Sequence, residues 1–238
     1  MNLDLREKTA VVTGGRNGII GPIITNMLIS AGARVIYFDL PCFDMGETDD
    51  IEKFCDIVKS NKYQFNLPNI IVHNAAIDPK PGTDNGSDPF RRHAEIMKVN
   101  HAGVVHLNSL LIPKMIANGG GVIVIIGSIM GYVSANPDNY QNGWLKAFGY
   151  NESKAALQMH CHNINTVYGK QGIRCVMPGF GPFEEGLSPT FMHGFGKKIP
   201  MQKPVSKKDL ELTLKYCLEC DSLAGEFRVD GGYTRVGR

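Results

Sequence analysis

The stretch that decides the fold is Lys8-Thr9-Ala10-Val11-Val12-Thr13-Gly14-Gly15-Arg16-Asn17-Gly18-Ile19-Ile20-Gly21. Its first six residues are rich in apolar and β-branched side chains, which predicts a short buried strand. Glycines follow at once, and the segment from Pro22 to Ser30 has the pattern of a helix. A glycine-rich turn between a strand and a helix lets the backbone approach a diphosphate, and the helix N-terminus supplies free N–H groups. The stretch therefore predicts a dinucleotide-binding unit, and a plain tight turn is the alternative.

A carboxylate at the end of the next strand strengthens this interpretation. The apolar run Arg34–Phe38 ends at Asp39. A carboxylate in this place accepts hydrogen bonds from the adenosine ribose hydroxyls and repels a 2′-phosphate. We therefore expect NAD as the cofactor and NADP as the less favoured one. Arg16 is the nearby cation that softens this preference, and the sequence leaves open whether it permits NADP.

Strand and helix patterns alternate along the rest of the chain. Strands are expected at 69–72, 121–126, 173–177 (broken by Pro178 and Gly179) and 225–229. Helices are expected at 49–59, from 89 to 117 with an interruption near Gly103, from Tyr150 onward, and at 207–220. The strand at 121–126 is continuously apolar, so both of its faces are covered. This order predicts an α/β fold: a Rossmann-type, doubly wound parallel β-sheet with helices on both faces, in a single domain over residues 1–238.

Composition removes several classes of function. The net charge is only +2 and no basic stripe occurs, so nucleic acid is not an expected partner. No apolar run reaches the roughly 20 residues that span a bilayer, and the first residues lack the order of a signal peptide, so we expect no membrane and a cytoplasmic protein. The cysteines are scattered, as in a reducing compartment. Cys217 and Cys220 are expected to be buried or partly buried thiols, and neither this pair nor His160-Cys161-His162 predicts a metal site.

Tyr150 and Lys154 are the strongest catalytic candidates. They stand four residues apart on an expected helix, so they lie on one face of it. A free tyrosine has a pKa of about 10, and a fixed positive charge within roughly 4–6 Å favours the phenolate. The pair is therefore a usable proton donor and acceptor. The alternative is a chance spacing on an amphipathic helix.

Three further polar or small-residue sites fall at strand ends or at a helix irregularity. Asn74-Ala75-Ala76 ends the middle strand, where small residues let a cofactor lie against the backbone. Asn100 stands inside the long helical stretch, where it can bind water or a backbone group beside the interruption. Ser128 follows the strand at 121–126, and its hydroxyl is expected to face Tyr150.

Together these residues resemble the short-chain dehydrogenase/reductase family from Lys8 to Thr234. The matching motifs are Thr13-Gly14 through Gly18, Asp39, Asn74-Ala75-Ala76, Asn100, Ser128, Tyr150-Asn151-Glu152-Ser153-Lys154, Pro178-Gly179 and Asp230-Gly231-Gly232. The resemblance implies that Tyr150 is the general acid/base and that Lys154 holds the nicotinamide ribose and lowers the pKa of the phenol. Ser128 would orient the substrate oxygen, and Asn100 would hold a water of a proton relay.

The resemblance also implies the cofactor residues, the reaction and the assembly. The reaction would be hydride transfer between NAD and a secondary alcohol or ketone, and the chain would form a homodimer or homotetramer through the helix after Lys154. The alternatives are a non-catalytic dinucleotide-binding redox sensor or scaffold, and epimerisation or dehydration of a nucleotide sugar, which the short chain disfavours. The expected cofactor-binding residues are Gly14, Arg16, Asn17, Gly18, Ile19, Asp39, Leu40, Asp44, Met45, Asn74, Ala75, Ala76, Tyr150, Lys154, Pro178, Gly179 and Gly181.

The chain departs from the family pattern in three places. The third loop glycine of the family falls at Ile20, and Gly21 comes one residue late. Too little sequence separates Asp39 from Asp44 for the helix that the family commonly has there, so Asp44 and Met45 are expected to flank the adenine at an exposed adenosine end. Ser128 and Tyr150 are separated by extra residues at about 134–146.

The extra segment and a later loop are the expected substrate region. Residues 134–146 hold the only Trp among several aromatic residues, which predicts an added wall suited to a polyhydroxylated substrate, or else a surface excursion. The loop at about 180–200 resembles the family's substrate lid and carries Phe180, Phe183, Phe191, Met192 and Phe195. A packed irregular loop is the alternative for that segment.

Overall fold

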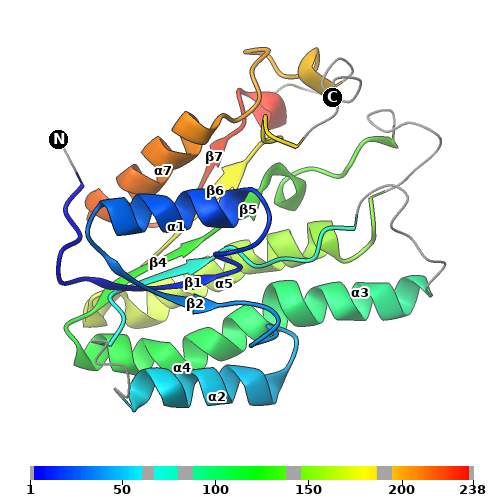
Figure 1. Ribbon diagram of the computed structural model, residues 1–238. Helices are drawn as coiled ribbons and strands as arrows, with labels where there is room; N and C mark the ends of the chain where they lie inside the picture. The colour runs from blue at the N-terminus through cyan, green and yellow to red at the C-terminus, as the bar shows by residue number, and fades with distance from the viewer. Residues whose placement is uncertain (1–2, 61–66, 80–87, 138–145, 187–194, 236–238) are drawn as a thin grey trace.

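A computed structural model describes residues 3–60, 67–79, 88–137, 146–186 and 195–235. Its centre is a parallel sheet in the order β2-β1-β3-β4-β6-β5, with β7 also paired to β6 (Figure 1). The ends of the first strands are level, since Thr13 pairs with Phe38 on one side and His73 on the other. The strands are β1 (Thr9–Thr13), β2 (Arg34–Phe38), β3 (Ile70–His73), β4 (Gly121–Ile125), β5 (Gly127–Ser128), β6 (Ile173–Phe180) and β7 (Gly225–Val229).

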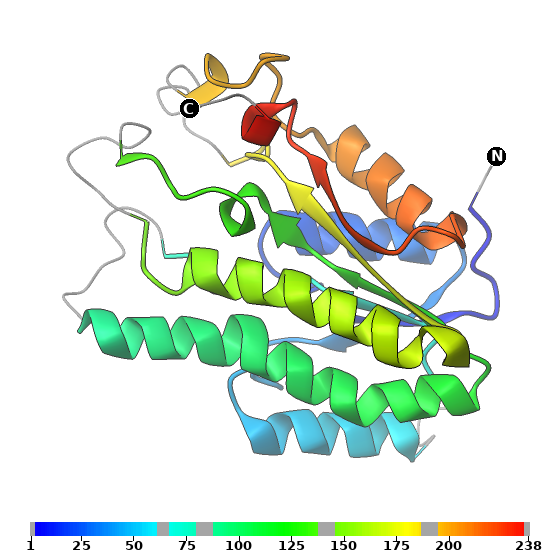
Figure 2. The same cartoon turned by 180° about the vertical axis from the view of Figure 1, so that it is seen from behind.

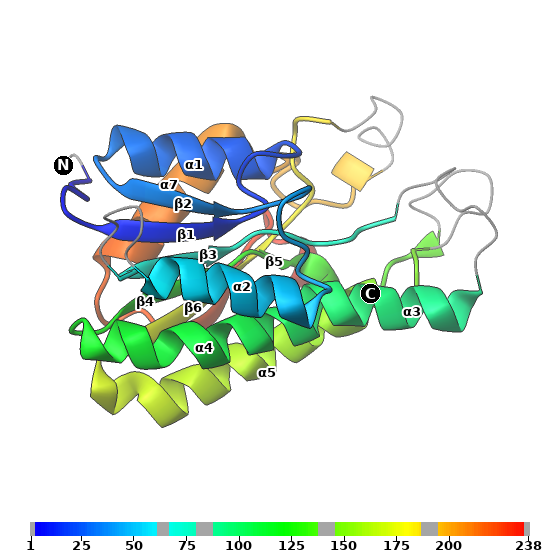
Figure 3. The ribbon, with the colours of Figure 1, turned by 60° about the horizontal axis from the view of Figure 1, so that its bottom comes forward.

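Helices cover both faces of the sheet (Figures 2 and 3). The helices α1 (Ile20–Ser30) and α7 (Lys207–Glu219) lie on one face. The helices α2 (Thr48–Lys59), α4 (Gly103–Ala117) and α5 (Tyr150–Tyr168) lie on the other, where α3 (Pro89–Met97) continues into α4. Successive residues of a strand point to opposite faces of the sheet. Ile71 packs on the face covered by α2, α4 and α5, whereas Val72 packs on the face covered by α1 and α7. The predicted doubly wound α/β fold is confirmed.

The prediction that the strand at 173–177 breaks at Pro178 and Gly179 is wrong. β6 continues to Phe180, because Gly179 pairs with Gly127 of β5 and with Arg228 of β7. Proline removes one N–H donor, but its fixed φ is compatible with an extended chain, so pairing on both sides resumes after it. The longer strand carries the chain further toward the edge of the sheet where the candidate site residues gather.

The expected absence of a helix directly after Asp39 is confirmed. Residues 39–47 are irregular, and the next helix begins at Thr48. In the described part of the chain β2 therefore stands at the edge of the sheet, paired with β1. The expectation for the thiols is also confirmed, with Cys217 buried and Cys220 half-buried.

The described residues contain neither a membrane-spanning helix nor a metal-binding cluster. No helix in the described segments has the length and apolar character to cross a bilayer. Within the same segments, no cluster of three or more His, Cys, Asp or Glu side chains is arranged to hold a metal ion.

Candidate functional site

The glycine-rich turn and the end of β3 are fastened to each other. The hydroxyl of Thr13 accepts hydrogen bonds from the N–H groups of Asn74 and Ala75, both at 3.1 Å. The Asn74 amide in turn donates to the carbonyl of Gly14 at 2.8 Å. Gly14 has a φ of +64°, and a Cβ on it would lie 2.9 Å from the Cα of Ala75. The small residues of both motifs therefore allow two stretches of backbone to lie in contact.

The late glycine takes the close-packing position at the start of α1. The helix begins at Ile20, and a Cβ on Gly21 would lie only 2.0 Å from the carbonyl oxygen of Gly14. Gly18 has a φ of +70° and open space where its Cβ would be. This turn thus presents an open cradle at a helix N-terminus, which fits the diphosphate of a dinucleotide. The one-residue shift of the glycine leaves that arrangement in place.

Asp39 closes the other side of the turn. Its carboxylate accepts hydrogen bonds from the Arg16 N–H at 2.6 Å and from the Asn17 amide at 2.8 Å. The Arg16 guanidinium lies 4.4 Å from the ring centroid of Tyr37, a cation–π contact. The Arg16 guanidinium thus lies over the ring of Tyr37 in β2, whereas the Asp39 carboxylate lies just after the end of that strand. Leu40, the next residue, is exposed.

Asp44 and Met45, the two residues predicted to flank the adenine, lie in different surroundings. Asp44 stays half-buried, and its carboxylate accepts the Gly46 N–H at 2.7 Å. Met45 is buried against the α2 and α4 side of the sheet. A Cβ on Gly103 would lie 2.0 Å from the Met45 carbonyl oxygen, so the backbone of this loop presses on α4. Adenine contact by these two residues stays a prediction.

The remaining predicted cofactor residues lie at the same carboxyl edge of the sheet. Ile19 precedes α1, and a Cβ on Gly186 would meet its side chain at 2.4 Å, so the loop after β6 reaches the glycine turn. Ala76 is exposed after β3. Pro178 and Gly179 lie in β6 just before its end at Phe180, and Gly181 donates its N–H to the Val229 carbonyl at 2.9 Å.

Lys154 is buried beneath Tyr150 on α5. Its Nζ donates to the carbonyl of Ile126 at 2.8 Å and lies 5.8 Å from the centroid of the Tyr150 ring. Burial lowers the pKa of Lys154 to about 8, an effect that Asp78 opposes and Lys146 adds to. The ammonium is therefore still mainly charged at neutral pH, and it is fixed at the end of β4 by a backbone group.

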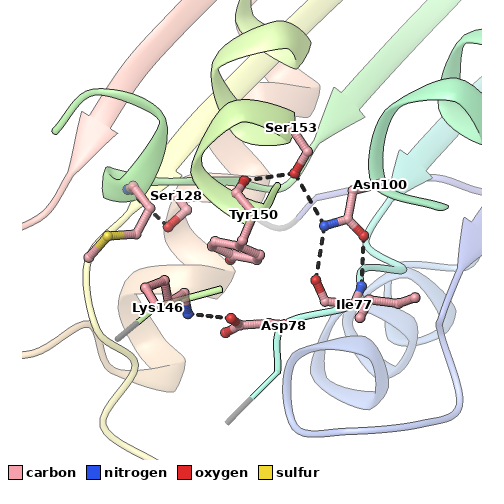
Figure 4. A network of polar contacts seen from close by, with 8 residues as sticks. Ile77, Asp78, Asn100, Ser128, Lys146, Tyr150 and Ser153 are labelled. Carbon is pink, nitrogen blue, oxygen red and sulfur yellow. Dashed lines mark hydrogen bonds and ion pairs between the residues drawn. The ribbon is translucent and has the colours of Figure 1, made fainter. Parts of the chain in front are cut away.

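Asn100 occupies a π-helical turn, η1 (Lys98–Ala102), between α3 and α4. Its amide oxygen accepts the N–H of Ile77 at 2.7 Å, and its amide nitrogen donates to the Ile77 carbonyl at 3.0 Å. The same nitrogen donates to the Ser153 hydroxyl at 3.2 Å, and that hydroxyl donates to the carbonyl of Tyr150 at 2.7 Å. The irregularity in the helix therefore lets one amide connect the loop after β3 to the first turn of α5 (Figure 4).

Ser128 and Tyr150 come from neighbouring segments of the site (Figure 4). The Ser128 hydroxyl accepts the Met130 N–H at 3.2 Å, which caps the short 3₁₀ helix that follows β5. Tyr150 is half-buried and packs against the small apolar cluster around Ile129 and Phe195. The structure therefore brings the four catalytic candidates, Asn100, Ser128, Tyr150 and Lys154, to one edge of the sheet.

Two charged residues at the site were missed from the sequence. Lys146 and Asp78 form an ion pair, with side-chain exposures of only 11% and 22%. The Lys146 Nζ lies 4.2 Å from the centroid of the Tyr150 ring. Asp78 follows the Asn74-Ala75-Ala76 motif and Lys146 precedes α5, but neither has a spacing that marks it as functional. Their meeting depends on two loops that are far apart in sequence.

A cavity of about 500 Å³ lies beside this edge. It is bordered by residues 130–135, 146–148 and the outer side of the first turns of α5. Tyr132 is in its wall, between Gly179 and the Arg228 guanidinium, which lies 4.3 Å from the ring centroid. Burial raises the pKa of Tyr132 to about 12, so this phenol stays protonated and does not duplicate the role predicted for Tyr150. A separate hollow of about 540 Å³ on α2 is bordered by Asp49, Glu52 and Asp56 and lies away from these residues.

The structure describes the predicted substrate region only in part. Residues 138–145, with Tyr140 and Trp144, and residues 187–194, with Phe191 and Met192, lie outside the described segments. Phe180 belongs to β6 and is buried, and Phe195 stacks on Tyr233 with ring centroids 4.6 Å apart. These two rings favour the packed-loop alternative over a free lid at their own positions.

Known proteins resemble the chain over most of its length. The family model described as short chain dehydrogenase matches residues 38–184. A 7alpha-hydroxysteroid dehydrogenase of Escherichia coli strain K12 is 30% identical, over 75% of this chain and 72% of its own.

Solved structures share the fold. A short-chain dehydrogenase from Leptospira borgpetersenii with bound NAD+ superposes with a TM-score of 0.81 at 23% identity, covering 97% of this chain and 94% of that one. A gluconate 5-dehydrogenase from Burkholderia cenocepacia, in complex with NADP and tartrate, has a TM-score of 0.78 at 21% identity, covering 99% and 98%.

Proposed function

Because the chain belongs to the short-chain dehydrogenase/reductase family, whose members are oxidoreductases that bind a nicotinamide dinucleotide, we propose that it is an NAD-dependent dehydrogenase of secondary alcohols, or in reverse a ketone reductase. A bound nicotinamide would accept or supply the hydride. The residues of the chain would bind and orient the substrate and move the proton of its oxygen. Tyr150 is the proposed general acid/base.

One observation carries this proposal: a buried ammonium beside a phenol at the edge where strands end. Lys154 is 5% exposed, is held by Ile126, and lies 5.8 Å from the Tyr150 ring centroid. Its remaining N–H donors are available to the ribose hydroxyls of a nucleotide, and its charge favours the phenolate. Because this lysine loses its charge as the pH rises through its pKa of about 8, it is best suited to support the phenol at and below that pH.

Ser128 and Asn100 have proposed supporting roles. The Ser128 hydroxyl accepts one backbone hydrogen bond from Met130, so its proton is free to point at a substrate oxygen. Two directed O–H groups, from Ser128 and Tyr150, stabilise charge that develops on that oxygen during hydride transfer. Asn100 supports the first turn of α5 through Ser153 and is the proposed site of a relay water.

The preference for NAD rests on Asp39. Its carboxylate is fixed by Arg16 and Asn17 at the end of β2, where a 2′-phosphate would meet a negative charge. Arg16 is the opposing cation, and its guanidinium is engaged with the Tyr37 ring. The related structures named above hold either NAD+ or NADP, so the fold alone accommodates both cofactors.

The proposed substrate is a small secondary alcohol or ketone, and a polyhydroxylated one is the narrower proposal. The cavity beside Tyr132 and Lys146 adjoins the proposed site and has both apolar and polar walls, although its lining does not include Ser128 or Tyr150. We also propose a homodimer or homotetramer that uses the outer face of α5, where Met159 and Val167 are 60% and 58% exposed.

The deciding experiment combines a substrate screen with the substitution Tyr150→Phe. We expect the wild-type protein to oxidise some secondary alcohols or polyols with NAD. The Tyr150→Phe variant should lose kcat by about 100- to 10,000-fold, the usual contribution of general acid–base catalysis, while its Kd for NAD stays within about threefold. Tyr216→Phe, on the outer surface of α7, is the matched control and should behave as wild type.

Two results would contradict the proposal. Near-normal turnover by the Tyr150→Phe variant would remove the assigned role of the phenol. Tight NAD binding with no turnover of any alcohol or ketone would favour a dinucleotide-binding sensor or scaffold in place of the enzyme.

A further inference from the structure

A second lysine lies closer to the Tyr150 ring than the family lysine does. The Lys146 Nζ is 4.2 Å from the ring centroid, whereas the Lys154 Nζ is 5.8 Å away. Figure 4 shows Lys146 beside the Tyr150 ring, with its ammonium directed at the Asp78 carboxylate. A cation over an aromatic face is attracted by the ring electrons, and more strongly so when the ring belongs to a phenolate.

The position of this lysine is fixed by the surrounding structure. Its ion pair with Asp78 joins the loop after β3 to the segment that leads into α5. Asp78 itself follows Ile77, whose N–H and carbonyl are both bound by the amide of Asn100. Because both charged side chains are mostly withdrawn from solvent, water and salt screen them less than an exposed pair. The ammonium therefore occupies a defined place over the ring.

The charged and titratable groups around Tyr150 come from several elements. From α5 itself come Lys154 and Glu152, whose carboxylate accepts the Gly149 N–H at 2.8 Å. From α3, the backbone of His93 packs on Gly149. Tyr233, from the C-terminal segment, belongs to the apolar cluster against which Tyr150 packs. From the segment before α5 comes Lys146, whose ammonium lies over the ring and is paired with Asp78.

We propose that Lys146 is a positioning residue that stabilises the phenolate form of Tyr150 during proton transfer, and that Asp78 holds this ammonium over the ring while offsetting part of its charge. The proposal rests on the proposed function of Tyr150. It also implies that the two partners act on the phenol in opposite directions. Loss of Lys146 leaves a negative charge near the ring, whereas loss of the Asp78 charge leaves the cation uncompensated.

The test uses four variants of the full-length protein: Lys146→Met, Lys146→Arg, Asp78→Asn, and the double variant that combines Lys146→Met with Asp78→Asn. The first measurement is the pH dependence of kcat for alcohol oxidation with NAD. Oxidation needs the phenolate, so the rate rises with pH through the pKa of the phenol. Lys146→Met should move this rising limb to higher pH by about one unit, which is roughly a tenfold loss of rate below the limb.

The other variants separate charge from shape. Asp78→Asn should move the limb to lower pH, Lys146→Arg should stay close to wild type, and the double variant should fall between the two single ones. A KM for NAD that stays within about twofold in all four shows that the cofactor site is intact. The main expectation is that Lys146→Met and Asp78→Asn shift the pH profile in opposite directions. If the ion pair had only a structural role, losing either partner would have the same effect.

A second measurement does not depend on turnover. The ultraviolet absorbance of phenolate is titrated in each protein and in the same protein carrying Tyr150→Phe, and the difference reports Tyr150 alone. This also separates the phenol from Lys154, because Asp78 and Lys146 act on that lysine as well. If the screen yields no substrate, the proposed function fails, but this titration still decides the inference about Lys146.

Three outcomes would overturn the inference. One is a Tyr150 titration that does not move in either single variant. Another is a shift of the same sign in both. The third is a Lys146→Met variant that loses stability in urea and kcat together while its pH profile stays in place, which would make the ion pair a structural brace only.

Discussion

At the scale of single residues, Asp39 combines a structural role with a proposed selective one. Asp39 is 9% exposed, and its carboxylate accepts hydrogen bonds from the Arg16 N–H and the Asn17 amide, so it shapes the glycine-rich turn. Such hydrogen bonds to an ionised acceptor are among the stronger ones in proteins. The same charge is the feature that opposes a 2′-phosphate. The two roles can be separated, because only the second depends on the negative charge.

We predict that Asp39→Asn weakens the preference for NAD over NADP. Asparagine keeps an oxygen acceptor for the turn but removes the charge that repels a phosphate. The ratio of kcat/KM for NAD to that for NADP should fall about tenfold, equivalent to about 1.4 kcal/mol. The ratio is measured at fixed ionic strength. Asp56→Asn, on the exposed surface of α2, is the control, and an equal change in that variant would show that the effect is not specific to Asp39.

At the scale of elements, the start of α1 depends on the absence of a side chain. Gly21 is buried in the first turn of the helix, where alanine would ordinarily be favoured by up to about 1 kcal/mol. A Cβ here would lie 2.0 Å from the Gly14 carbonyl oxygen, inside any acceptable contact. The contacted atom belongs to the backbone directly after β1 and cannot rotate away as a side chain could, so the whole helix would have to move. Packing of this element on the turn thus outweighs helix propensity.

We predict that Gly21→Ala lowers the free energy of unfolding by about 2–4 kcal/mol, the upper range for overpacking a tight contact. Gly169→Ala is the matched control, since Gly169 ends α5 with a φ of −57° and no atom within 4 Å of its Cβ position. The control should be neutral or slightly stabilising. Urea unfolding of both variants gives the comparison, and a Gly21→Ala protein as stable as its control would contradict the packing argument.

At the scale of the whole molecule, a buried polar chain connects the sheet to two helices. His73, at the end of β3, shares a 2.8 Å hydrogen bond with Asn108 of α4, and the Asn108 amide lies 3.1 Å from the Nε2 of His160 on α5. The Nδ1 of His73 is buried and has no hydrogen-bond partner among the described residues. A proton added there would have no acceptor. Burial accordingly lowers the pKa of His73 to about 4 and that of His160 to about 4.

We predict an acid-sensitive stability that comes from this chain. Between the unfolded pKa of about 6.5 and the folded pKa of about 4, the unfolded protein binds more protons, so the free energy of unfolding falls as the pH drops through this window. The fully buried His73 should contribute about 1–3 kcal/mol and the partly exposed His160 less.

The measurement compares urea unfolding at several pH values between 7 and 4 for wild type and His160→Gln. Glutamine can still accept from Asn108 but cannot take up a proton, so the variant should show a shallower fall. Parallel curves for the two proteins would exclude His160 as a source of the acid sensitivity. Carboxylates elsewhere affect both proteins alike and cancel in the comparison.

The sequence by itself determined the fold class, the element order and the identities of the four catalytic candidates. These follow from local patterns: the apolar run before the glycines, the helical periodicity, and the four-residue spacing of Tyr150 and Lys154. It also indicated that the Asn100 amide stands beside an interruption of the helix, where the structure has a π-helical turn. Such features depend on neighbours within a few residues, and this is why they can be read without coordinates.

Only the tertiary structure decided how distant segments meet at the site. Lys146 reaches Asp78 across 68 residues of sequence, and Gly186, in the loop after β6, lies against the side chain of Ile19 in the glycine-rich turn. The continuation of β6 past Pro178 likewise depends on pairing with β5 and β7, which no local rule contains. The physical reason is common to all three cases. Each depends on contacts between segments whose relative position is set by packing of the whole sheet.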